Sequence, residues 1–70
     1  METTGTVRSI RMRKGRGRIE FDFQHNDETV KTGNAVYQTK IVKAIQKDQS
    51  VNVVYRRDKP KKAFIRDIFA

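Results

Sequence analysis

The sequence predicts a mainly β fold: a small closed barrel of five short strands, with one short helix or 3₁₀ crossing between the third and the fourth. Apolar and polar residues alternate in several short segments, which is the period of a strand with one buried face. In two places the alternation slips by one residue, as it does where a strand is bulged or sharply coiled. The chain has 70 residues and no cysteine, so we expect a single small domain held together by apolar packing.

The first strand leads into a glycine-rich turn. Val7 is apolar, and so are Ile10 and Met12, so the phase slips by one residue and predicts a bulge or bend. Residues 14–17, Lys-Gly-Arg-Gly, form the predicted turn, because glycine adopts positive φ and allows close backbone approach.

The second strand has the clearest alternation, over residues 18–24. Its predicted core residues are Ile19, Phe21 and Phe23. The opposite side carries Arg18, Glu20, Asp22 and Gln24. A polar turn over residues 25–28 then leads to a short third strand over residues 29–32.

A helical crossing is predicted within residues 35–47, where the helical spacing i, i+4, i+8 is occupied by Tyr37, Ile41 and Ile45. Gly33 and Asn34 interrupt the strand pattern before it, and Asn34 is the predicted N-cap. The segment also contains β-branched valines, which favour a 3₁₀ or irregular crossing as the alternative. Tyr37 either packs the crossing or offers its ring to a ligand.

The last two strands are separated by a turn over residues 58–61, in which Pro60 cannot donate a ladder hydrogen bond. Before the turn, the alternating apolar residues are Val51, Val53 and Tyr55. After it, the apolar residues are Ala63, Ile65 and Ile68, with the second slip in phase.

Three strands, a crossing and two strands are most economically arranged as an OB-type barrel. An SH3-like barrel is the alternative, since it also uses five short strands. Residues 5–70 form the single predicted barrel domain, and residues 1–4 are predicted to be a disordered N-terminus.

The charge balance predicts a polyanionic partner. Sixteen Lys and Arg against eight Asp and Glu give a net charge of +8, with an isoelectric point near 10.3. The first basic cluster consists of Arg8, Arg11, Arg13, Lys14, Arg16 and Arg18. The second consists of Arg56, Arg57, Lys59, Lys61 and Lys62. They flank the first and last turns, which border the oligonucleotide site of an OB barrel, so we expect them to converge on one groove with Lys31 between them.

Two segments resemble the opening of bacterial cold-shock domains. Gly5-Thr6-Val7-Arg8 is similar to their G-T-V-K, and Lys14-Gly15-Arg16-Gly17-Arg18-Ile19 is similar to their K-G-F-G-F-I at the same distance. Residues 63–68 fit the A-x-V-x-x-L ending of that family more loosely. The resemblance implies a five-stranded OB barrel that binds single-stranded RNA and DNA.

The base-stacking aromatic residues of that family are absent at the matched positions. Ser9 and Ile10 occupy the first-strand positions, Arg16 and Arg18 replace the two phenylalanines, and residues 29–33 carry no ring. Stacking contributes about 1–3 kcal/mol per base, so we expect arginine–phosphate contacts to dominate here, with little dependence on sequence. Tyr37 is the candidate stacking residue.

Catalytic constellations are not evident, so we expect no enzyme activity, no metal and no other cofactor. His25 has no second metal ligand in reach along the sequence, and Ser9 and Ser50 lack a base partner. Glu20 and Asp22 are interpreted as surface ion-pair partners of neighbouring cations.

The predicted function is therefore a nucleic-acid-binding module. The alternative is a non-enzymatic protein-interaction or regulatory module that docks an acidic partner, and attachment to an anionic membrane surface is a weaker third. No apolar run approaches the roughly 18 residues that span a bilayer, and the polar first five residues do not resemble a secretory signal, so a cytoplasmic protein is expected.

Overall fold

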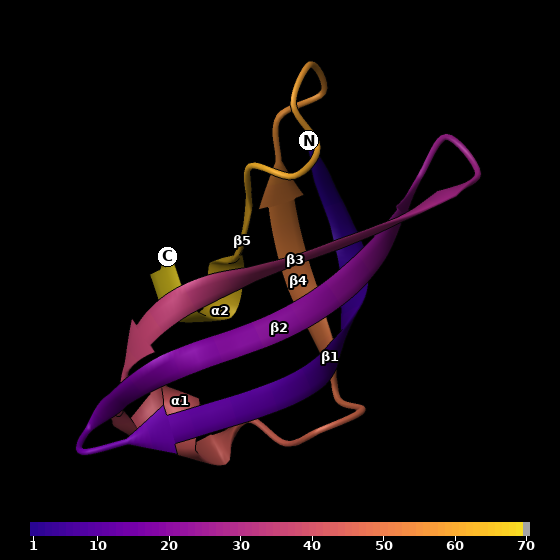
Figure 1. Cartoon of the computed structure of the whole chain (residues 1–70). Helices are drawn as coiled ribbons and strands as arrows, with labels where there is room; N and C mark the ends of the chain where they lie inside the picture. Colours follow the sequence, from indigo (N-terminus) through magenta and orange to yellow (C-terminus); the bar gives the residue numbers. More distant parts are fainter. Residues whose placement is uncertain (70) are drawn as a thin grey trace.

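The computed structural model describes residues 1–69 and shows a nearly closed barrel of antiparallel strands with two short helices (Figure 1). Its elements are β1 (Glu2–Arg13), β2 (Arg16–His25), β3 (Glu28–Tyr37), α1 (Lys40–Ala44), β4 (Ser50–Tyr55), β5 (Ala63–Ile65) and α2 (Arg66–Phe69). The strand order β3-β2-β1-β4-β5 returns β4 to the side of β1, which is a Greek-key arrangement. This confirms the predicted mainly β fold, a small OB-like barrel with a helical crossing between β3 and β4.

β1 contains the predicted bulge. Val7 pairs with Phe21 and Ser9 pairs with Glu20, so Arg8 is the extra residue in this ladder. Val7 and Ile10 can then both face the barrel interior. The start of β1 differs from the prediction, because residues 2–4 are not a disordered terminus but pair with β4.

Two-residue turns close both hairpins. Lys14 and Gly15 have φ values of 54° and 81°, and Asn26 and Asp27 have φ values of 49° and 65°. Positive φ at both central residues is the mark of the type I′ turn, whose twist suits a two-residue hairpin. The first turn is therefore shorter than the predicted 14–17 segment, and Gly17 lies within β2.

The core matches the predicted alternation. The buried hydrophobic residues are Val7, Ile19, Phe21, Phe23, Val36, Val42, Ile45, Val51, Val53, Tyr55, Ala63 and Ile65. The rings of Phe23 and Tyr55 lie 4.8 Å apart, and the Tyr55 hydroxyl reaches the barrel rim at 3.1 Å from Nδ1 of His25. Asp22 is also buried, although its strand position faces outward, because Arg8 covers its carboxylate.

The crossing is shorter than predicted, because β3 continues through Gly33 and Asn34 as far as Tyr37. Residues 33–37 pair with β2 in a strand ladder, so their backbone groups find hydrogen-bond partners there and not within a helix. The N-cap is Thr39, whose hydroxyl accepts from the backbone N–H of Val42 at 3.2 Å, so the prediction of Asn34 as N-cap is wrong.

Asn34 instead closes the barrel between β3 and β5. Its Nδ2 donates to the carbonyl of Ala63 at 3.0 Å, and its Oδ1 accepts from the N–H of Ile65 at 3.1 Å. Nearby, the hydroxyl of Thr32 donates to the carbonyl of Lys61 at 3.0 Å. Side chains of β3 therefore reach the backbone of β5 across this seam.

The second predicted slip has a different origin from the first. Ile65 ends β5 and Ile68 lies in α2, so the phase changes because the strand becomes a helix. The carboxylate of Asp67 in this helix accepts from the backbone and side-chain amides of Asn52 at 3.3 and 3.2 Å, which fastens α2 to β4.

Substituting Gly17→Ala is expected to destabilise the barrel by about 1–3 kcal/mol, the usual range for overpacking. A Cβ at position 17 would lie 1.8 Å from the carbonyl oxygen of Arg11, so backbone must move. The matched control is Gly33→Ala, where the tightest contacts are at 3.0 Å and include the flexible end of Arg18. Urea unfolding followed by circular dichroism measures both, and an equal loss in the two variants would contradict the close-approach argument.

Substituting Asn34→Asp is expected to lower the free energy of unfolding by about 1 kcal/mol or more, because a partly buried polar group loses its partner. The substitution keeps the acceptor for Ile65 but turns an oxygen toward the carbonyl of Ala63. Gln24→Ala, which removes an exposed side-chain hydrogen bond to Thr29, is the control and should change stability little. Urea unfolding measures both variants, and unchanged stability in Asn34→Asp would show that these hydrogen bonds do not hold the seam.

Candidate nucleic-acid interface

Four arginines form a two-by-two array on the outer face of the β1–β2 hairpin. Arg11 lies directly opposite Arg18, and Arg13 lies directly opposite Arg16. Directly opposed residues project from the same side of a sheet, and so do residues two apart along a strand. All four are exposed, and Lys14 lines a surface hollow with Arg13 and Arg16 at the hairpin tip. We call these four residues the arginine array.

The arginine array has no neutralising partner among residues 1–69. The ion pairs within this range are Arg8–Asp22, Arg56–Asp58 and Arg66–Glu2. Like charges directly opposite one another in a strand pair are destabilising, by up to about 1 kcal/mol. The array therefore concentrates positive charge that a bound anion would relieve.

Two predicted contact residues are already engaged by carboxylates. Arg8 Nε donates to Oδ2 of the buried Asp22 at 2.5 Å. Arg56 donates from Nε and Nη2 to the Asp58 carboxylate at 3.2 and 3.0 Å. A phosphate would have to compete with these carboxylates, which makes both residues weaker candidates than the array.

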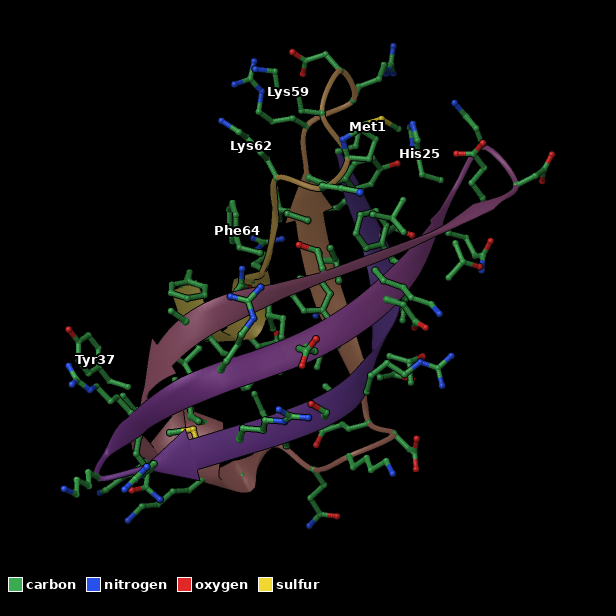
Figure 2. All side chains as sticks on the ribbon, in the orientation of Figure 1. Met1, His25, Tyr37, Lys59, Lys62 and Phe64 are labelled. Carbon is green, nitrogen blue, oxygen red and sulfur yellow. The ribbon has the colours of Figure 1, made fainter. Side chains whose placement is uncertain are left out.

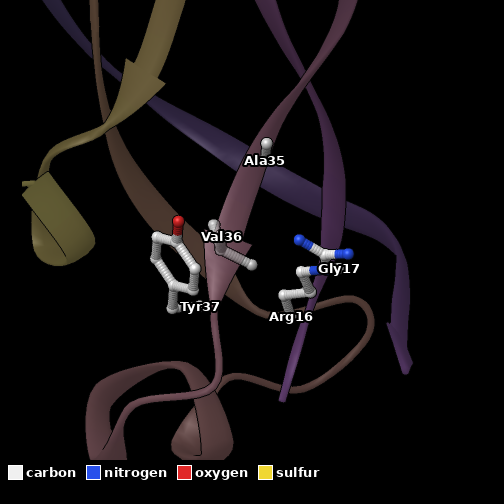
Figure 3. A pocket seen from close by; sticks show the side chains of 5 residues that line it. All are labelled: Arg16, Gly17, Ala35, Val36 and Tyr37. Carbon is white, nitrogen blue, oxygen red and sulfur yellow. The ribbon is translucent and has the colours of Figure 1, made fainter. Parts of the chain in front are cut away.

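The end of β3 extends the interface beside the array. Tyr37 pairs with Arg16 and Ala35 pairs with Arg18, so all four project from the same outer face. Arg16, Ala35 and Tyr37 line a surface hollow of about 390 Å³ with Gly17 and Val36. Figure 3 shows the Tyr37 ring and the Arg16 side chain on neighbouring strands. Tyr37 is 75% exposed, so its ring is accessible to a ligand and is not packed into the crossing.

The side chain of Arg18 lies over Gly33 of β3, where no side chain stands in its way. A Cβ at position 33 would lie only 3.0 Å from both Nε and Nη2 of Arg18. The guanidinium group therefore lies close to the β3 backbone. Two residues further along β3, the side chain of Ala35 is also small, so it projects little from the sheet. At this end of the sheet, small side chains on β3 are bordered by arginines on β2.

Beyond this surface the outer face is balanced in charge. Asp22 pairs across the ladder with Lys31, and Glu20 pairs with Gly33. Lys31 lines one hollow with Arg8, Arg18 and Glu20 and another with Pro60 and Lys61, so it lies between the two basic clusters. Apart from Arg18 of the array, this middle region holds two cations, Arg8 and Lys31, and two carboxylates, Glu20 and Asp22. The carboxylates break the continuity of the basic surface.

The second basic cluster lies at the far end of β3 from the array. The end of β4 pairs with the start of β1, where Val54 lies opposite Glu2, whereas the array occupies the end of β1. Lys61 packs near Thr32 and lines a hollow with Glu28 to Lys31. Figure 2 shows Lys59 and Lys62 at the top of the molecule and Tyr37 at the lower left.

The prediction that both clusters border one continuous basic groove is therefore corrected. β1 is long enough to separate its two ends, and the β4–β5 turn follows the end that pairs with residues 2–4. The cluster residues Arg57, Lys59, Lys61 and Lys62 are exposed and form a separate basic region beside the β2–β3 hairpin.

Two exposed aromatic residues complete the surface and were not among the predicted contacts. Phe64 is 40% exposed and Phe69 is 48% exposed, and their rings meet edge to face at a centroid distance of 6.1 Å. They line a hollow with Asn34 and Ala35. The sequence holds a signal for Phe64, because alternation places it opposite to the buried Ala63 and Ile65. Phe69 is brought to the site only by α2.

Groups with catalytic potential are used structurally. His25 contacts the hydroxyl of Tyr55, and the hydroxyl of Ser9 donates to Glu20 at 3.3 Å. Residues 1–69 contain no group of three or more His, Cys, Asp or Glu side chains placed to hold a metal ion. None of the helices in this range has the length and apolar character needed to cross a membrane.

No family model, no curated protein and no solved structure matches this chain. The resemblance to cold-shock domains therefore stays a prediction from the residues quoted above.

Proposed function

We propose that this chain is a non-enzymatic, cytoplasmic nucleic-acid-binding module that grips the phosphate backbone with the arginine array. The observation that carries the proposal is the direct opposition of Arg11 with Arg18 and of Arg13 with Arg16, with no carboxylate partner for any of them among residues 1–69. Guanidinium groups match phosphate oxygens with paired hydrogen bonds and keep their charge at any physiological pH.

The position of the array on the barrel supports the same function. OB barrels bind oligonucleotides on the face of strands 2 and 3 and on the flanking loops. The array covers the end of this face at the β1–β2 turn, and Tyr37 lies on the adjacent strand. The resemblance to cold-shock domains points in the same direction, with arginines in place of two stacking rings.

Phosphate contacts make the proposed binding largely independent of sequence and sensitive to salt. Each phosphate neutralised on a single strand contributes about −0.7 to the slope of log K against log salt, so four contacts give a slope of about −3. The basic β4–β5 turn contributes a second, weaker contact region for a longer strand, because it lies at the other end of β3.

Neutralising Arg16 and Arg18 together, as Arg16→Gln with Arg18→Gln, is expected to weaken binding and to reduce the steepness of the salt slope by about 1.4. Lys59→Gln with Lys62→Gln removes the same charge from the β4–β5 turn and is the matched control, with a smaller expected effect. Fluorescence anisotropy with labelled single-stranded RNA, single-stranded DNA and duplex DNA, each at several salt concentrations, measures both variants.

The two pairs of substitutions separate a local site from a general effect of charge. Equal losses in both variants would show that net charge alone drives binding and that the array is not the site. If none of the nucleic acids binds at low salt, the proposal is wrong, and docking of an acidic protein becomes the better explanation of the basic surface.

A further inference from the structure

The hollow lined by Phe64 and Phe69 adjoins the arginine array at Ala35. Ala35 lines the hollow that contains Arg16 and Tyr37, and it also lines the hollow that contains Phe64 and Phe69. Across the ladder, Ala35 lies directly opposite Arg18. Ala35 itself is exposed and has a small side chain. It is bordered by Arg18 on β2, by the rings of Phe64 and Phe69 from β5 and α2, and by the Tyr37 ring two residues further along β3.

The rings at this site are exposed in a way that the core does not require. Phe64, Phe69 and Tyr37 are 40%, 48% and 75% exposed, whereas Phe21 and Phe23 are at most 3% exposed. The edge-to-face packing of Phe64 with Phe69 holds each ring in position and leaves part of each ring facing the solvent. Clustered apolar surface of this kind in a small domain generally marks a binding site.

The neighbouring charges select the kind of ligand. A purely apolar partner would leave the unpaired guanidinium groups of Arg16 and Arg18 at its edge without compensation. A ligand that combines a flat ring with a nearby anion satisfies both parts of the site. Nucleotides have this composition, with each base joined to its phosphate through one sugar.

We propose that this end of β3 binds unpaired bases of single-stranded nucleic acid. One base packs against Phe64 and Phe69 above Ala35, a neighbouring base stacks on Tyr37, and Arg16 and Arg18 bind the adjoining phosphates. This inference rests on the proposed function and narrows it, because the bases of a duplex are stacked on each other and cannot reach the rings. The site differs from the stacking positions of the cold-shock resemblance, since Phe64 and Phe69 come from the last strand and the final helix.

The test compares three labelled ligands of equal length: single-stranded DNA, an abasic strand with the same phosphates, and a duplex. The single strand is expected to bind at least about 25-fold more tightly than the abasic strand, because the abasic strand lacks both stacked bases and each contributes about fivefold or more. Single-stranded RNA forms a further arm and should show the same base dependence.

Two sets of substitutions then locate the base contacts. Phe64→Leu with Phe69→Leu keeps apolar bulk but removes both rings, and Tyr37→Leu does the same from β3. Each is expected to lower affinity for the single strand at least about fivefold and to leave binding of the abasic strand unchanged. Ile41→Ala is the matched control, because Ile41 is a 52% exposed apolar residue on α1 that lines neither hollow. Thermal unfolding confirms that each variant is folded.

The outcomes distinguish this inference from the function on which it rests. Equal binding of the base-containing and abasic strands, with a steep salt slope, overturns the base site and leaves phosphate binding in place. Absence of binding to every strand at low salt overturns the proposed function itself. Binding of an acidic tyrosine-containing peptide as tightly as the single strand overturns the inference in favour of a protein ligand.

Discussion

The extra residue in β1 at Arg8 decides which side chains of the first hairpin face the solvent. In an unbroken strand, the parity that buries Val7 would also turn Arg11 and Arg13 toward the core. The bulge reverses this parity, so that Ile10 and Met12 pack against the core and the arginines lie outside. The ion pair between Arg8 and the buried Asp22 holds Arg8, the extra residue of the bulge, against β2. The arginine array thus depends on one local irregularity of the backbone.

The array is also held by a rigid frame. The type I′ turn at Lys14 and Gly15 connects the strands directly, and the bare backbone of Gly17 allows β2 to lie close to β1. Four like charges on such a frame oppose folding to a small extent, but the backbone that carries them loses little conformational freedom when an anion binds. The same geometry that makes the hairpin locally unfavourable therefore makes it an effective site for a polyanion.

Much of the fold could be predicted from short-range pattern, whereas the site depended on long-range pairing. Alternation identified Ile19, Phe21 and Phe23 as core, and the slip after Val7 located the bulge, because both signals are local. Asn34 was wrongly predicted as an N-cap because its real partners, Ala63 and Ile65, are distant in the sequence. The two basic clusters were expected to converge because both flank turns, but composition does not show which end of a long strand each turn adjoins.

The seam between β3 and β5 is closed by side chains and not by a backbone ladder. Each other pair of neighbouring strands is joined by a backbone ladder, but here the side chains of Thr32 and Asn34 span the junction. A nucleotide lying over Ala35 and against Phe64 would touch both margins of this junction. Occupancy would then favour the fully closed cylinder by mass action, so that ligand recognition and the completeness of the fold are thermodynamically linked.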